Sequence, residues 1–179
     1  ETGADLYLST WNGRVWSRPA AMAALNTAAN ERGAAFSRDG QHLYFSSDRE
    51  GGAGGYDLYA AQFDGTNWTD VVPFSDTINS PKNESGPAAS ADDSLLYFSS
   101  DRVSGSETKD IYVAERLAAD ENATAPQFAK AEPVSVLNSA ADDIETALTG
   151  RGDHVFLASN RAKEGDEGFN LYLSRVVNG

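Results

Sequence analysis

Three glutamates recur along the sequence, each just before a segment that reads as a strand, and their carboxylates are the first candidates for chemistry. They are Glu31, Glu84 and Glu145. If the strands that follow them line one channel, the three carboxylates form a ring at its mouth, where oxygen ligands suit Ca²⁺ or a cationic group. Alternatively, each glutamate caps backbone donors in its own turn. The glutamates are thus candidate ligand-binding residues. No cofactor is expected, and Ca²⁺ is the alternative that a carboxylate ring would allow.

Three arginines recur in the same way. Arg49, Arg102 and Arg161 each follow an aspartate or an asparagine. A guanidinium group binds a carboxylate through two parallel hydrogen bonds, so these residues are candidates for binding an acidic ligand. Each arginine could instead pair with a carboxylate of its own or the neighbouring unit. Recurrence in every unit favours this structural role.

The sequence offers no evident catalytic constellation. His42 and His154 are the two histidines, and they lie at equivalent points of different units, where they are not expected to meet. The absence of cysteine excludes a thiol nucleophile and a cysteine-based zinc site. No Gly-x-Ser-x-Gly nucleophile elbow occurs. We therefore predict no catalytic residues, although the many acidic residues leave hydrolysis by a carboxylate pair open.

The charge of the chain limits its partners. Fourteen basic and 27 acidic residues give a formal net charge of -13, and the mean hydropathy is -0.46. Such a surface repels nucleic-acid phosphates and anionic lipid headgroups. The apolar stretches are far shorter than the roughly 20 residues of a membrane-spanning helix. Nucleic-acid binding and membrane insertion are therefore not expected, whereas cationic peptides and divalent cations remain suitable partners.

An internal repeat organises the chain, and such a repeat indicates architecture before single elements are considered. Each copy has a polar turn, an apolar strand ending in Ser and Arg, a loop, and then an Asp/Asn-Leu/Ile-Tyr strand. Residues 4–7 repeat residues 56–59, so the chain begins within a unit. We predict one domain over residues 1–179, with units at approximately 1–21, 33–74, 86–135 and 144–175.

Short alternating runs between turn residues predict four antiparallel strands in each complete unit. In the first complete unit these are residues 34–37, 42–47, 57–63 and 68–74, with Asp-Gly hairpin signals after Arg38 and Phe63. The whole chain is expected to form thirteen strands. A helix competes only at residues 20–29, which we interpret as a connection with one helical turn at most.

These motifs resemble the TolB-type propeller repeat, a relative of the WD repeat. The version with Trp-x-x-Pro, Leu-Asn-Thr and Asn-Glu before the first strand, seen here at residues 16–19, 25–27 and 30–31, is similar to copies in bacterial envelope proteins, often beside OmpA-like domains. The resemblance covers nearly the whole chain, with Asn160 and Asp93 as departures from the usual Asp and Gly. It implies an all-β fold, a β-propeller of four-stranded antiparallel blades.

About three blades plus two strands do not close a ring, whereas closed propellers have 4 to 8 blades. We therefore expect either a fragment of a larger propeller or two chains that together complete a six-bladed ring.

The resemblance implies a non-catalytic binding or scaffolding module of an exported or cell-envelope protein, in an extracytoplasmic location. It would dock a protein, a peptide or an envelope polymer on the propeller face, with specificity in the variable loops at 50–55 and 162–168. The alternative is a propeller enzyme or an enzyme-associated domain, such as a glycan lyase or a peptidase gating domain. Because the chain opens at Glu1 without a Met or an apolar signal, its natural start is expected to have been processed, trimmed or replaced.

Overall fold

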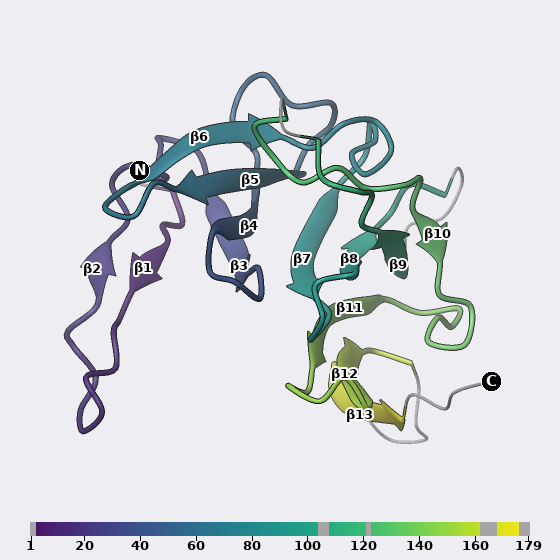
Figure 1. The fold of residues 1–179 in the computed structure, drawn as a ribbon. Coiled ribbons are helices and arrows are strands. Elements are labelled where there is room, and N and C mark those ends of the chain that lie inside the picture. Colours follow the sequence, from purple (N-terminus) through teal and green to yellow (C-terminus); the bar gives the residue numbers. More distant parts are fainter. Residues whose placement is uncertain (1–2, 104–107, 121–122, 162–167, 176–179) are drawn as a thin grey trace.

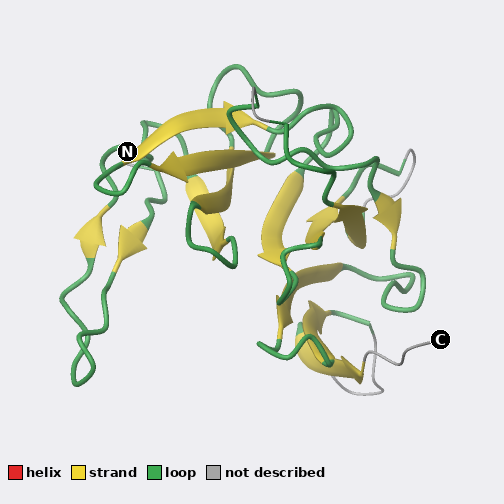
Figure 2. Cartoon of the chain, viewed as in Figure 1, coloured by secondary structure: helices red, strands yellow, loops and turns green. Residues whose placement is uncertain are grey.

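The computed structural model describes residues 3–103, 108–120, 123–161 and 168–175. Within these ranges the chain forms thirteen strands in four antiparallel sheets, and no helix (Figure 2). The sheets follow one another along an arch, with the first sheet at one foot and the last sheet at the other (Figure 1). This confirms the predicted all-β propeller architecture and its number of strands.

The first two sheets are a hairpin and a complete four-stranded blade. The inner edge of the blade is its first strand, and each later strand pairs with the one before it. The hairpin consists of β1 (Tyr7–Leu8) and β2 (Ala20–Ala21), and the blade consists of β3 (Glu31–Phe36), β4 (His42–Ser47), β5 (Asp57–Phe63) and β6 (Trp68–Pro73).

The last two sheets repeat this plan. The third sheet has four strands and the fourth has three among the described residues. The third consists of β7 (Glu84–Ala89), β8 (Leu95–Ser100), β9 (Asp110–Glu115) and β10 (Glu132–Pro133), and the fourth of β11 (Asp143–Leu148), β12 (His154–Ser159) and β13 (Asn170–Arg175).

The inner strand begins earlier than the sequence predicts. We expected it at residue 34, but β3 starts at Glu31, whose backbone pairs with Ser47. The N–H of Glu31 donates to the carbonyl of Ala4, just before β1, at 2.7 Å. The Ala-rich segment 20–29 is not a helix. It contributes β2 and then a tight turn, in which the N–H of Leu25 donates to the carbonyl of Met22 at 2.8 Å.

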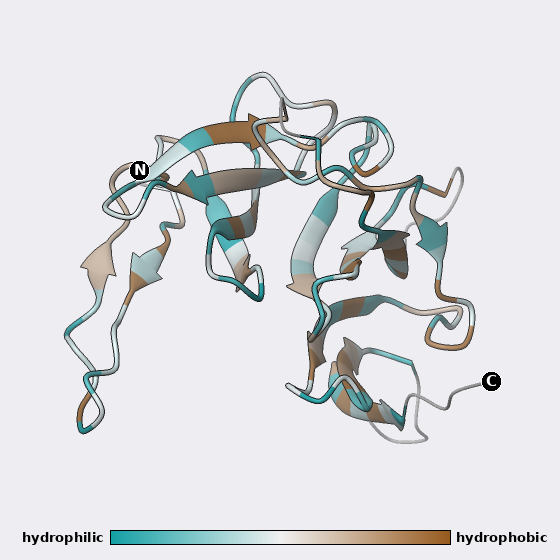
Figure 3. Cartoon of the chain, in the orientation of Figure 1, coloured by the Kyte–Doolittle hydropathy of each residue, from teal (hydrophilic) through white to brown (hydrophobic). Residues whose placement is uncertain are grey.

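The core lies between successive sheets. Tyr44 and Leu58 of the second sheet share one buried cluster with Leu96, Phe98 and Tyr112 of the third. Burying a side chain of this size contributes about 1.5–3 kcal/mol, so stacking of the sheets stabilises the fold. Figure 3 shows hydrophobic segments on strands such as β6 and β9. Two smaller clusters join the first sheet to the second and the third to the fourth.

A recurring asparagine ties each connection to the sheet before it. The side chain of Asn79 accepts a hydrogen bond from the N–H of Leu58 at 2.9 Å and donates to its carbonyl at 3.0 Å, as a neighbouring strand would. Asn26 does the same for Leu6, and Asn138 for Ile111. This role explains the asparagine in the Leu/Ile-Asn-Ser/Thr motif.

Candidate functional site

The predicted glutamates and arginines meet in a buried cluster, which we call the clamp. Glu31, at the start of β3, contacts Arg49 at 3.1 Å, and its side chain is fully buried. Its Oε1 accepts hydrogen bonds from Thr27 Oγ1 at 2.7 Å and from Ser47 Oγ at 3.0 Å, and its Oε2 accepts one from the Thr27 N–H at 2.9 Å. Arg49 also donates to the carbonyl of Leu25 at 2.7 Å.

The clamp recurs in the third and fourth sheets. Glu84 contacts Arg102 at 3.2 Å, and Asp143 contacts Arg161. The predicted equivalence of Glu145 with the other two glutamates is wrong, because Asp143 occupies their position. Each clamp carboxylate precedes its arginine by 18 residues, a spacing in the sequence that would have found Asp143.

In two of the clamps the surroundings lower the pKa of the carboxylate, and these are the clamps of Glu31 and Asp143. Burial by itself raises the pKa of Glu31, but hydrogen bonds from Thr27 and Ser47 and the charge of Arg49 together lower it below its ordinary value. Burial also raises the pKa of Asp143, but hydrogen bonds from Ser159, Arg161 and Ser139 bring it below its ordinary value. Glu31 and Glu84 accept the backbone N–H groups of Thr27 and Ser80, each at 2.9 Å, which confirms the alternative that they cap their own turns. The structural pairing of the three arginines with carboxylates is confirmed as well. Ligand binding by these residues stays a prediction.

Aromatic rings cover the clamp arginines on the same sheets. Guanidinium groups within about 6 Å of a ring centroid are attracted by the ring. This stacking further fixes the arginines in place as parts of the blades. The distances from the guanidinium carbon to the ring centroid are 4.9 Å for Arg49 and Tyr59, 4.6 Å for Arg102 and Tyr112, and 4.9 Å for Arg161 and Tyr172.

Each inner strand has a bulge just after its clamp carboxylate. Gly33, Gly86 and Glu145 occupy equivalent bulge positions and have φ angles of 56°, 61° and 50°. Glycine adopts this left-handed conformation readily, whereas it costs other residues roughly 1–2 kcal/mol. Glu145 is thus a strained residue at a position that the two other blades give to glycine, and its side chain is exposed.

A groove of about 700 Å³ runs along the inner strands and brings the bulges together. The backbones of adjacent bulges lie close, since a Cβ added to Gly33 would come within 3.3 Å of the Cα of Gly86. The strands β3, β7 and β11 border the inner side of the arch in Figure 1. The lining includes Gly33, Gly86, Glu145 and Thr146 from the inner strands, Lys109 just before β9, Phe169 just before β13, and Leu171 in β13.

The groove carries charges of both signs beside an apolar wall. Arg32 stacks on the Tyr56 ring at 3.9 Å, and Lys109 Nζ lies 3.4 Å from Ser85 Oγ. The carboxylate of Asp142 accepts the Lys109 N–H at 2.8 Å. Such a surface can bind the backbone and charged side chains of an extended ligand, and Glu145 provides an exposed carboxylate for a cation.

The other predicted features lie away from this groove or outside the described residues. His42 and His154 are on different sheets, and burial lowers the pKa of His42. The loop at 50–55 packs against the connection that leads to the next sheet, where the Gly55 N–H donates to the Lys82 carbonyl at 3.0 Å. Residues 162–167 of the other variable loop lie outside the described residues.

The carboxylates do not form the predicted ring, because Glu31 and Glu84 are enclosed in separate clamps. In the part of the chain that the structure describes, no group of three or more His, Asp or Glu residues is arranged to hold a metal ion. Ca²⁺ binding stays an untested alternative. The described residues form no helix, and so none that is long and apolar enough to cross a membrane.

Neither a family model nor a curated protein matches the sequence. Among solved structures, the crystal structure of TolB from Acinetobacter baumannii is similar, with a TM-score of 0.54 and 14% sequence identity. The alignment covers 96% of this chain and 35% of the TolB chain, so this chain spans about a third of that structure. At such low identity the similarity concerns the fold. The chain therefore has a TolB-like β-propeller fold, of which it forms an arch of blades.

Proposed function

We propose that this chain is a non-catalytic binding and scaffolding module of an exported or cell-envelope protein. Its inner groove would dock an extended segment of a protein or peptide, or a strand of envelope polymer. The TolB-like fold supports a role in protein interaction, and the groove offers charged groups and an apolar wall along three adjacent blades.

The strained Glu145 carries this proposal. A residue kept in an unfavourable backbone conformation indicates a function when the surrounding structure holds it there. The two equivalent positions have glycine, so the fold itself does not need a carboxylate at this bulge. Because Glu145 is exposed in the groove, its carboxylate is available to a cationic group of the ligand.

Peptide binding with a charge-reversed groove tests the proposal. A library of extended peptides with different net charge is titrated against the chain and against Glu145→Lys. Cationic peptides should lose about tenfold in affinity, or about 1.4 kcal/mol, because the attraction becomes a repulsion. Asp76→Lys is the matched control, since Asp76 is also exposed but lies on a connection outside the groove.

Two results would count against the proposal. One is equal binding by Glu145→Lys and the control, which would place the ligand elsewhere. The other is turnover of a polysaccharide or peptide by the purified chain, which would favour the enzymatic alternative over a binding module.

A further inference from the structure

Two cationic side chains line the groove at the same level of neighbouring inner strands. Arg32 in β3 and Ser85 in β7 each directly follow the clamp carboxylate of their strand, and Lys109 Nζ lies 3.4 Å from Ser85 Oγ. The next residue in each strand is the bulge glycine, and the two bulges lie close together. Arg32 and Lys109 therefore face the same stretch of the groove, which both of them line.

Neither cation has a direct counter-ion. Among the residues that the structure describes, neither Arg32 nor Lys109 forms an ion pair. The two carboxylates that interact with them electrostatically are held by asparagines through both oxygens, Asp48 by Asn30 and Asp101 by Asn83. The guanidinium and ammonium groups are therefore available to an anionic group of a ligand.

Stacking on a ring orients Arg32 for binding. Its guanidinium carbon lies 3.9 Å from the centre of the Tyr56 ring. A guanidinium stacked on a ring keeps its N–H groups at its edge, where they can donate two parallel hydrogen bonds to a carboxylate. Since the ring already holds this side chain in place, less conformational freedom is lost when a ligand binds.

A buried hydroxyl in the groove independently indicates a polar ligand. Thr146 follows Glu145 in β11, lines the groove and is 9% exposed. Its Oγ1 is buried and has no hydrogen-bond partner among the described residues. A buried polar atom without a partner is costly, so a polar ligand group beside Glu145 would satisfy it.

The distribution of charge identifies the class of ligand. Two neighbouring blades supply the cations Arg32 and Lys109, and the next blade supplies the exposed carboxylate of Glu145. A complementary ligand has a carboxylate close to a cation. An extended peptide with an acidic and a basic side chain has both groups. An acidic polysaccharide has no cation for Glu145, and the formal net charge of -13 repels it.

We infer that the groove binds an extended peptide segment in which an acidic residue lies within a few residues of a basic one. The acidic side chain contacts Arg32 and Lys109, and the basic side chain contacts Glu145. This inference rests on the proposed function, because it specifies which peptides the groove would dock.

Fluorescent peptides with a movable acidic residue test this inference. Each peptide carries one central lysine, and a single Glu or Gln is placed in turn at every other position. Fluorescence anisotropy measures the dissociation constants. At one or more positions near the lysine, the Glu peptide should bind the wild-type chain about tenfold more tightly than the Gln peptide. Polygalacturonate, a polyanion without cationic groups, should not displace it.

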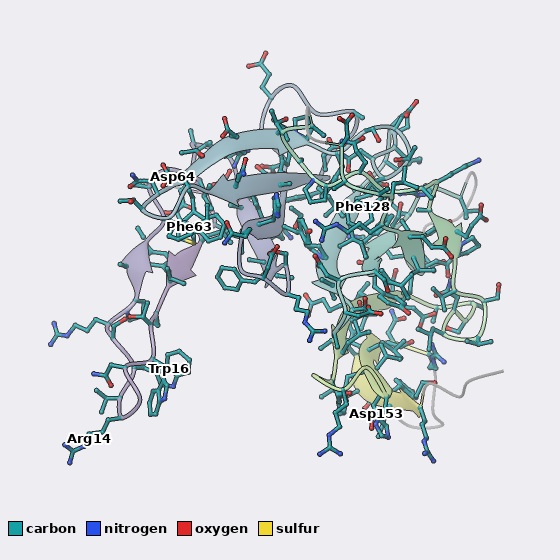
Figure 4. All side chains as sticks on the ribbon, in the orientation of Figure 1. Arg14, Trp16, Phe63, Asp64, Phe128 and Asp153 are labelled. Atoms are coloured by element: carbon teal, nitrogen blue, oxygen red, sulfur yellow. The ribbon has the colours of Figure 1, made fainter. Side chains whose placement is uncertain are left out.

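The double variant Arg32→Gln/Lys109→Gln should lose this preference for Glu, because no cation remains for the carboxylate. Arg14→Gln/Lys130→Gln is the matched control, since it removes the same two charges from exposed side chains outside the groove, and it should keep the preference. Arg14 lies at one foot of the arch (Figure 4). Circular dichroism and a cooperative thermal transition establish that the variants are folded, and the two single variants replace the double one if it is not.

Three outcomes would overturn the inference. They are equal binding of all Glu and Gln peptides to the wild-type chain, a preference for Glu that the double variant keeps, and displacement of the peptide by polygalacturonate. The proposed function fails separately, when Glu145→Lys binds cationic peptides as tightly as the wild type does. Loss of affinity in Glu145→Lys without any preference for Glu would refute the inference alone.

Discussion

At the scale of the residue, Glu145 differs most clearly from the residues that stabilise the fold. This glutamate is equivalent to Gly33 and Gly86 but adopts the same left-handed conformation, with φ of 50°. The clamp carboxylates behave differently, because each is buried beside an arginine that matches its charge. The strained carboxylate of Glu145 is therefore the functional candidate, whereas the carboxylates paired with arginines stabilise the structure.

Glu145→Gly should therefore stabilise the chain while weakening ligand binding. Removing the left-handed strain should raise the free energy of unfolding by about 1 kcal/mol, as measured by urea denaturation. Glu115→Gly is the matched control, since Glu115 is an exposed strand residue without a positive φ, and it should lower stability by roughly 0.5–1 kcal/mol. A loss of stability in Glu145→Gly would contradict the assignment of strain.

Glu31→Gln should destabilise the chain in a pH-dependent way. At neutral pH the loss should be about 3 kcal/mol, because Arg49 is left in its site without a counter-charge. The folded pKa of Glu31 is lowered from 4.5, so its contribution is present above that pH and is lost as the pH falls through the folded pKa. Urea denaturation near neutral pH and at about pH 3 checks both points. A loss that is equally large at low pH would contradict the charged clamp.

At the scale of the element, the repeat is held together by bonds between a connection and the sheet before it. The asparagine of each connection binds both backbone groups of one residue in the third strand. Hydrophobic contact alone fixes neither the spacing nor the rotation of neighbouring sheets, whereas this pair of directional bonds does.

Asn79→Ala should thus cost roughly 2–3 kcal/mol of unfolding free energy, because Leu58 loses the partner of its buried N–H and C=O groups. Thermal or urea unfolding measures the change. Asn67→Ala, in the exposed turn between β5 and β6, serves as the control and should change stability by about 0.5 kcal/mol or less. Equal changes in unfolding free energy at the two positions would show that the side-chain hydrogen bonds of Asn79 do not stabilise the fold.

At the scale of the whole molecule, the arch exposes apolar side chains at both feet. Tyr7 and Trp16 are 60% and 66% exposed in the first sheet and its hairpin, and Leu171 is 80% exposed in the last sheet. In the sheets between them the equivalent Tyr59 and Leu58 are buried, so contact between neighbouring sheets is what removes these side chains from water.

The sequence by itself determined the repeat, the all-β fold and the strands His42–Ser47 and Asp57–Phe63, whose bounds are as predicted. It could do so because apolar alternation and turn residues are local signals that return in each unit. It also indicated that residues repeated in every blade, such as Arg49, serve the structure.

Only the tertiary structure decided which carboxylate of the last blade pairs with the arginine and which one lies in the groove. Matching residue types paired Glu145 with Glu31, but the bulge assigns Asp143 to the clamp and turns Glu145 into the groove. The groove itself joins residues of three sheets. These features arise from packing between segments far apart in the chain, which no local pattern of residues encodes.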